Sequence, residues 1–111
     1  METKRIYLAT PYSHPDEQIR TQRFMAVSRR ANQLMQSGHL VFSPITHGHI
    51  LGAFGGLPGD FAFWEAHCLS FLRHWAQELH VLALPGWQES RGVLAEMAEA
   101  GRLGLPVWHL K

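Results

Sequence analysis

Residues 79–96 read LHVLALPGWQESRGVLAE, and this stretch decides the fold. Its first part, Leu79–Leu84, is a short apolar run of the length and composition typical of a buried strand. Pro85-Gly86-Trp87 is a turn, and Ser90 is a residue type that often caps the start of a helix. Helical spacing of apolar residues then continues to about Leu103. A strand, a tight turn and a helix together form half of a parallel βαβ unit.

The same alternation continues on both sides of this stretch. Short apolar runs predict further strands, and apolar residues at helical spacing predict further helices between them. The predicted strands are residues 5–9, 40–43 and 106–110, and the predicted helices are residues 13–37 and 60–75. Because helices separate all the strands, the sequence predicts right-handed crossovers between parallel strands.

Local signals locate two helix starts and one loop. Ser13 with Asp16 three residues later resembles a capping box at the start of the first helix. Asp60 has the side chain of a helix cap. Residues 44–59 are rich in glycine and proline and predict a long irregular loop.

These elements predict a single domain over residues 1–111. The predicted fold is a small Rossmann/flavodoxin-like three-layer α/β sandwich with a parallel sheet of four to five strands. Ligands of such sheets bind outside the carboxyl ends of the strands. We therefore expect a site built from residues 10–15, 44–59 and 85–92 and from the chain end.

The composition argues against several classes of protein. A formal net charge of +1 creates no basic field for nucleic acid. The single cysteine, Cys68, allows no internal disulfide and suits a reducing compartment. No stretch reads as a signal peptide or a transmembrane helix. We therefore expect a cytoplasmic protein that binds neither nucleic acid nor a membrane.

The segment from Ser90 to Glu96 combines features of a ligand site. Backbone amides at a helix start, with the Ser90 hydroxyl beside them, favour an anion, and Gly92 lets a ligand approach the backbone closely. Glu96 lies about one and a half turns into the helix, on the same side as Gly92. It is therefore a candidate to point into the cleft. The alternative interpretation is that Ser90 is only a cap and Glu96 is a solvated helix residue.

The order Ser90-x-Gly92-Val93-x-x-Glu96-x-x-x-Ala100 is similar to the nucleoside 2-deoxyribosyltransferase-like superfamily. The opening Ile6-Tyr7-Leu8-Ala9 also fits this superfamily. The pieces Val41-x-Ser43-Pro44 and Leu84-Pro85-Gly86-Trp87 resemble a bacterial and phage subgroup of it. The resemblance spans nearly the whole chain and implies an enzyme that cleaves or transfers an N-glycosidic bond.

The resemblance implies a role for four residues. Glu96 falls at the position of the family's nucleophilic glutamate, which forms a glycosyl-enzyme intermediate. Ser90 and Gly92 match positions that hold the 5′-phosphate in nucleotide-using relatives. Tyr7 matches a tyrosine that orients the nucleophile in some members. A carboxylate near a helix start is expected to stay ionised, as a nucleophile must.

The sequence departs from the family at the predicted general acid. Members usually carry an acidic residue about two turns before the third strand, where this chain has Cys68-Leu69-Ser70. Asp60, just after the glycine-rich loop, is the substitute candidate for a catalytic acid. The alternative interpretation is that Asp60 only caps its helix.

Other residues in the edge segments are candidates for contacting substrate. They are Thr10, Ser13, Ser43, His47 and Trp87. His47 and His49 are expected to line the cleft and contact the base or sugar, with a metal site as the weaker alternative. Trp87 is either a stacking surface for a base or a cover for the core. The arginines of the first helix, including Arg20 and Arg23, are expected on a solvated face.

The sequence therefore predicts a nucleoside deoxyribosyltransferase or a nucleoside 5′-monophosphate N-glycoside hydrolase. The predicted enzyme needs no cofactor and no metal, and its ligand is a small nucleoside or nucleotide. The alternatives are a non-catalytic nucleotide-binding or sensing module and, more weakly, a metal-dependent hydrolase. Small size and family habit predict a homo-oligomer, either a dimer or a tetramer.

Overall fold

A computed structural model describes residues 2–111 of the chain. Four short apolar segments pair there as parallel strands in the order β2-β1-β3-β4. The elements in chain order are β1 (Arg5–Ala9), α1 (Glu17–Gln36), β2 (Leu40–Phe42), α2 (Pro44–Ala53), α3 (Phe61–His74), β3 (Glu78–Leu82), the 3-10 turn η1 (Trp87–Glu89), α4 (Arg91–Leu103) and β4 (Val107–Leu110). The predicted parallel α/β sandwich is confirmed, with four strands in this part of the chain.

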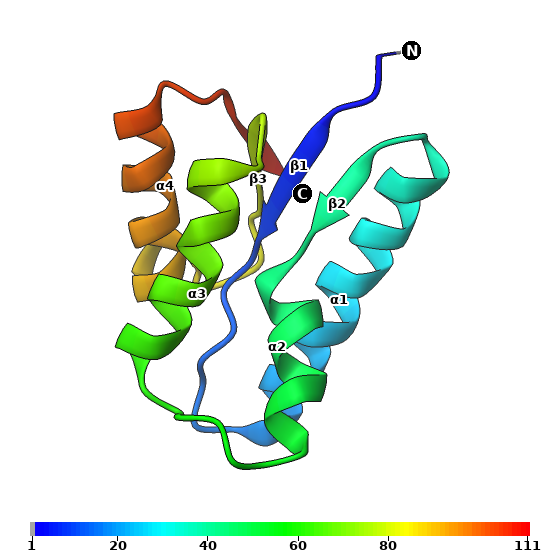
Figure 1. Cartoon of the computed structure of the whole chain (residues 1–111). Coiled ribbons are helices and arrows are strands. Elements are labelled where there is room, and N and C mark those ends of the chain that lie inside the picture. The colour runs from blue at the N-terminus through cyan, green and yellow to red at the C-terminus, as the bar shows by residue number, and fades with distance from the viewer. Residues whose placement is uncertain (1) are drawn as a thin grey trace.

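Side chains of the central strands alternate between two cores. Tyr7 and Ala9 of β1 pack with residues of α3 and α4 in one core, whereas Leu8 packs with Val27 and Ala31 of α1 in the other. This alternation follows from the two-residue period of a strand. Figure 1 shows α3 and α4 on one side of the strands, and α1 and α2 on the other. The sheet is therefore the middle layer of three.

The order of the strands creates a switch point between β1 and β3. The chain leaves β1 into α1 on one face of the sheet and leaves β3 into α4 on the opposite face. The loops that follow these two neighbouring strands therefore diverge at the carboxyl edge. Ligands of open α/β sheets bind at such a point.

The predicted irregular loop at 44–59 is wrong in its first part, because residues Pro44–Ala53 form the helix α2. Ser43 begins this helix, since its hydroxyl accepts the backbone N–H of Thr46 at 3.2 Å. The loop was predicted from glycines and prolines, of which Pro44, Gly48 and Gly52 lie within α2. Gly48 has a packing role there. A Cβ atom at Gly48 would lie 3.3 Å from the ring of Trp64. The small residue lets α2 and α3 approach closely.

The ends of the other helices follow local signals with one exception. Asp60 and Ser90 begin α3 and α4 as predicted, and Gly104 ends α4 with a φ of 73°. The cap of α1 is Asp16, whose side chain accepts the N–H of Gln18 at 2.9 Å, so the predicted capping role of Ser13 is wrong. Of the helices in residues 2–111, none is both long and apolar enough to cross a membrane.

Candidate functional site

Glu96 faces the protein interior from the second turn of α4. The Ser90 hydroxyl accepts the N–H of Val93 at 3.3 Å and sets the start of the helix. The helical period then turns Val93, Glu96 and Ala100 toward the sheet, and all three are buried. Only 8% of Glu96 is exposed, so the alternative of a solvated helix residue is wrong.

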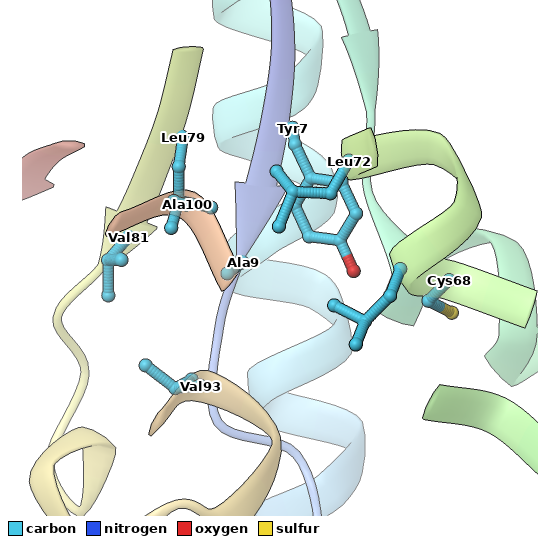
Figure 2. Packing of buried hydrophobic residues seen from close by; sticks show 9 residues of the cluster. Tyr7, Ala9, Cys68, Leu72, Leu79, Val81, Val93 and Ala100 are labelled. Carbon is cyan, nitrogen blue, oxygen red and sulfur yellow. The ribbon is translucent and has the colours of Figure 1, made fainter. Parts of the chain in front are cut away.

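Glu96 is hydrogen-bonded to β1, one of the two central strands of the sheet. The hydroxyl of Tyr7, on β1, donates to Oε2 of Glu96 across 89 residues of sequence. Tyr7 itself is fully buried. Figure 2 shows its ring beside Leu72, on the side of the sheet where α3 carries Cys68. The sequence placed these two residues in one site, and the structure brings them into direct contact.

Burial controls the protonation of this cluster. Desolvation raises the pKa of Glu96 to about 8, although the hydrogen bond from Tyr7 acts in the opposite direction. Burial and the adjacent Glu96 raise the pKa of Tyr7 well above its ordinary value of 10.0. Burial also raises the pKa of the Cys68 thiol to about 12, and Glu96 adds to this shift. At neutral pH Tyr7 and Cys68 therefore carry their protons, and so do most of the Glu96 carboxyl groups.

The prediction that Glu96 stays ionised is therefore wrong for the free protein. That prediction rested on the positive end of the helix dipole. The dipole acts mainly within the first turn, whereas Glu96 lies beyond it. Loss of hydration is the larger effect for a carboxyl group buried to this degree.

Several predicted residues lie along the carboxyl edge of the sheet. Thr10 follows β1 and is 4% exposed, and its hydroxyl oxygen has no hydrogen-bond partner within residues 2–111. Ser43 follows β2 and caps α2, and Ser90 caps α4 beyond β3. Gly92 lies in the first turn of α4. Ser13 lies in the loop after β1, where its side chain is exposed.

The other predicted residues have different partners. Asp60 caps α3 by accepting the N–H of Phe63 at 3.0 Å and is exposed, as its alternative interpretation predicted. Trp87 packs against the core, with its ring 5.1 Å from that of His109. The core-covering interpretation of Trp87 therefore describes its position.

The two histidines of the predicted loop, His47 and His49, lie on α2 and have different partners. His47 lies with its Nε2 atom 3.2 Å from Nε2 of His67, on α3. His49 stacks on Phe24 at 4.0 Å, and its Nδ1 atom is 2.7 Å from the hydroxyl of Tyr12. Within residues 2–111, no three His, Cys, Asp or Glu side chains gather as a group that could hold a metal ion.

Two hollows lie away from the Glu96 carboxyl group. One of about 460 Å³ lies between β2 and α3 and is lined by residues that include Phe42, Phe71 and Trp75. The other, of about 510 Å³, lies along the outer face of α1. Neither hollow is lined by Tyr7 or Glu96.

One residue of the carboxyl edge was not predicted from the sequence. Arg23 of α1 was expected on a solvated face, but its guanidinium donates to the carbonyl oxygens of Ser13 and Pro85, each at 3.1 Å. The helical spacing of α1 gives no sign of this contact, because Pro85 is 62 residues away in sequence. Only the packing of α1 beside both loops reveals it.

Comparison with models of known protein families identifies the family of this chain. The family described as "Domain of unknown function (DUF1937)" matches residues 4–111. A search of curated proteins found no match.

Proposed function

For this chain, which belongs to the DUF1937 family, we propose an enzyme that breaks the N-glycosidic bond of a nucleoside or a nucleoside 5′-monophosphate. The observation that carries the proposal is the buried pair of Tyr7 and Glu96. A buried carboxyl group with a strongly raised pKa, beside the carboxyl edge of a parallel sheet, is a candidate reactive group. The sequence order around Glu96, which resembles deoxyribosyltransferases, suggests the reaction.

In the proposed reaction, Glu96 attacks the anomeric carbon of the sugar. The C–N bond to the base breaks, an ester C–O bond to Glu96 forms, and the base leaves with the electron pair and takes up a proton. Water or a second base then attacks the same carbon and releases Glu96. Tyr7 holds one carboxyl oxygen, so the other is the atom free to attack.

The proposed nucleophile must lose its proton before it reacts. With a pKa of about 8, roughly one tenth of the Glu96 side chains are ionised at pH 7. The rate of sugar transfer is therefore expected to rise with pH until about pH 8. If Glu96 instead donated a proton to the leaving base, the rate would fall over the same range.

Base release from defined substrates tests the proposal. Purified protein is incubated with the four deoxynucleosides and their 5′-monophosphates, and free base is measured by chromatography. Wild type is expected to release base, whereas Glu96→Ala is not. Glu99→Gln is the matched control, because Glu99 lies on the same helix and is equally buried. Equal base release by wild type and Glu96→Ala would remove Glu96 as the nucleophile.

A second candidate function is nucleotide binding without turnover. The observation that favours it is the thiol of Cys68 beside Glu96, which has a pKa of about 12. Cys68 lies in the segment where deoxyribosyltransferase-like proteins usually carry an acidic residue. Such a thiol is a poor proton donor to a leaving base at neutral pH. This candidate predicts thermal stabilisation by a nucleoside monophosphate with no release of base at any pH between 5 and 9.

A further inference from the structure

Two loops at the carboxyl edge carry most of the candidate substrate-contacting residues. The first loop, residues 10–16, follows β1 and contains Thr10 and Ser13. The second loop, residues 83–90, follows β3 and contains Trp87 and Ser90. These loops flank the switch point between β1 and β3, where they run to opposite faces of the sheet. Their separation therefore affects any ligand that binds at this switch point.

Arg23 connects these two loops. Its Nη1 atom donates to the carbonyl oxygen of Ser13, and its Nη2 atom donates to the carbonyl oxygen of Pro85, each at 3.1 Å. A guanidinium is a rigid planar fork, so two of its nitrogens can bind two carbonyl groups at a set distance. Both hydrogen bonds join α1 to backbone carbonyl oxygens, so they restrain the backbone of the two loops.

The second loop is shaped to admit the guanidinium. Gly86 has a φ of 92°, a conformation that favours glycine. A Cβ atom at Gly86 would lie only 3.0 Å from Nη2 of Arg23. The turn therefore needs glycine both for its backbone conformation and for the approach of Arg23 to Pro85.

Arg20 provides an internal comparison one turn earlier on α1. Its Nη1 atom donates to the carbonyl oxygens of His14 and Pro15, both in the first loop. Arg20 thus ties the first loop to its own helix, whereas Arg23 also ties it to the second loop. Both arginines bind backbone carbonyls of the first loop, but only Arg23 also binds the second loop, which makes Arg20 a matched control.

We propose that Arg23 is a positioning residue that holds the first and second loops at the separation needed to bind substrate. It acts through the backbone of Ser13 and Pro85 and not on the reacting atoms. The effect on substrate binding rests on the proposed function, but the connection between the loops does not.

Hydrogen exchange tests the connection directly. The amides of Trp87, Glu89 and Ser90 are hydrogen-bonded within the second loop, so their exchange reports its opening. Arg23→Lys keeps the charge but replaces the fork with a single ammonium group. We expect exchange at residues 87–90 to be roughly fivefold faster in Arg23→Lys than in wild type. Arg20→Lys is expected to leave exchange at residues 87–90 unchanged.

Two results would overturn the connection. One is that residues 87–90 exchange at the same rate in Arg23→Lys as in wild type. The other is that exchange at residues 87–90 is accelerated in Arg20→Lys as much as in Arg23→Lys. Circular dichroism checks that both variants are folded. Arg23→Gln, which also lacks the fork, is the second variant should the lysine variant not fold.

Kinetics test the effect on substrate. For a nucleoside 5′-monophosphate that wild type cleaves, Arg23→Lys is expected to raise KM roughly tenfold and to change kcat much less, because the loops lose their alignment. A roughly tenfold fall in kcat with an unchanged KM would contradict a positioning role. If wild type neither binds nor cleaves these compounds, the proposed function fails, while hydrogen exchange still decides whether Arg23 joins the loops.

Discussion

Glu96 and Glu99 lie one turn apart on α4, and each is 8% exposed, yet their side chains meet opposite environments. Glu96 meets the hydroxyl of Tyr7 in the core, and burial raises its pKa to about 8. Glu99 binds the guanidinium groups of Arg102 and Arg73, and these bonds hold its pKa below 4.5. Two carboxyl groups with the same exposed fraction thus differ in charge, because exposed arginines cover Glu99 whereas the protein core surrounds Glu96.

The difference separates reactivity from stability. The two arginines satisfy the charge of Glu99, and the pair with Arg73 joins α3 to α4, which is what a structural ion pair does. Ionising a buried carboxyl group that has no cation beside it costs free energy, because the charge is neither hydrated nor paired. Buried carboxyl groups with such shifted pKa values are more frequent at functional sites than elsewhere, which is why we propose that the reaction occurs at Glu96.

The largest expected effect that separates the two residues is on catalysis. Glu96→Gln is isosteric but cannot form the glycosyl ester, so base release should fall on the order of a thousandfold. Glu99→Gln should stay within about threefold of wild type, because it lies outside the proposed reaction. The measurement is initial rate of base release at pH 8. Comparable losses in both variants would show that the contrast between the two carboxyl groups has no catalytic meaning.

The next effect is on stability and has the opposite sign to the effect on catalysis. Folding raises the pKa of Glu96 from 4.5 to about 8, so the stability of wild type is complete below pH 4.5 and falls as pH rises toward 8. Glu96→Gln lacks this loss and should be more stable than wild type by about 3 kcal/mol at pH 7. Urea unfolding at pH 4 and pH 7 measures the difference, which should nearly vanish at pH 4.

Removing the hydroxyl of Tyr7 tests how Glu96 is held. Tyr7→Phe deletes the hydrogen bond that lowers the Glu96 pKa, so that pKa should rise further above 8. The alkaline shift should be visible in the pH dependence of base release. Stability should fall by about 1 kcal/mol at pH 6, where Glu96 is protonated in both proteins. An acid shift of the profile would mean that Tyr7 does not favour the ionised form.

The smallest effect is expected at Glu99. Its pKa is lowered by folding, so its contribution to stability is present above pH 4.5 and is lost as pH falls through the lowered pKa. Glu99→Gln should therefore be less stable than wild type at pH 7, and the difference should disappear in acid. Because Arg102 and Arg73 are themselves substantially exposed, solvent and salt limit this loss. Thermal unfolding at low and high salt measures it.

The sequence predicted most of the fold because its signals are local. Ser90 and Asp60 each bind an amide three residues ahead, and Gly104 ends α4 through its own backbone conformation. Such interactions are complete within a few residues of chain. The largest failure, at α2, came from reading Pro44, Gly48 and Gly52 as loop residues, although Pro44 lies in the first turn of that helix and Gly48 makes room for Trp64. A glycine needed for packing looks the same in sequence as a glycine needed for a turn.

The sequence by itself determined the alternation of strands and helices, and with it the place of Glu96 beside the carboxyl edge of a parallel sheet. Only the tertiary structure decided that Glu96 is neutral, that Glu99 is ionised, and that Arg23 joins two loops. The physical reason is that hydration and charge depend on neighbours in space. Those neighbours lie 89 residues away for Glu96 and 62 for Arg23, beyond the reach of any local pattern.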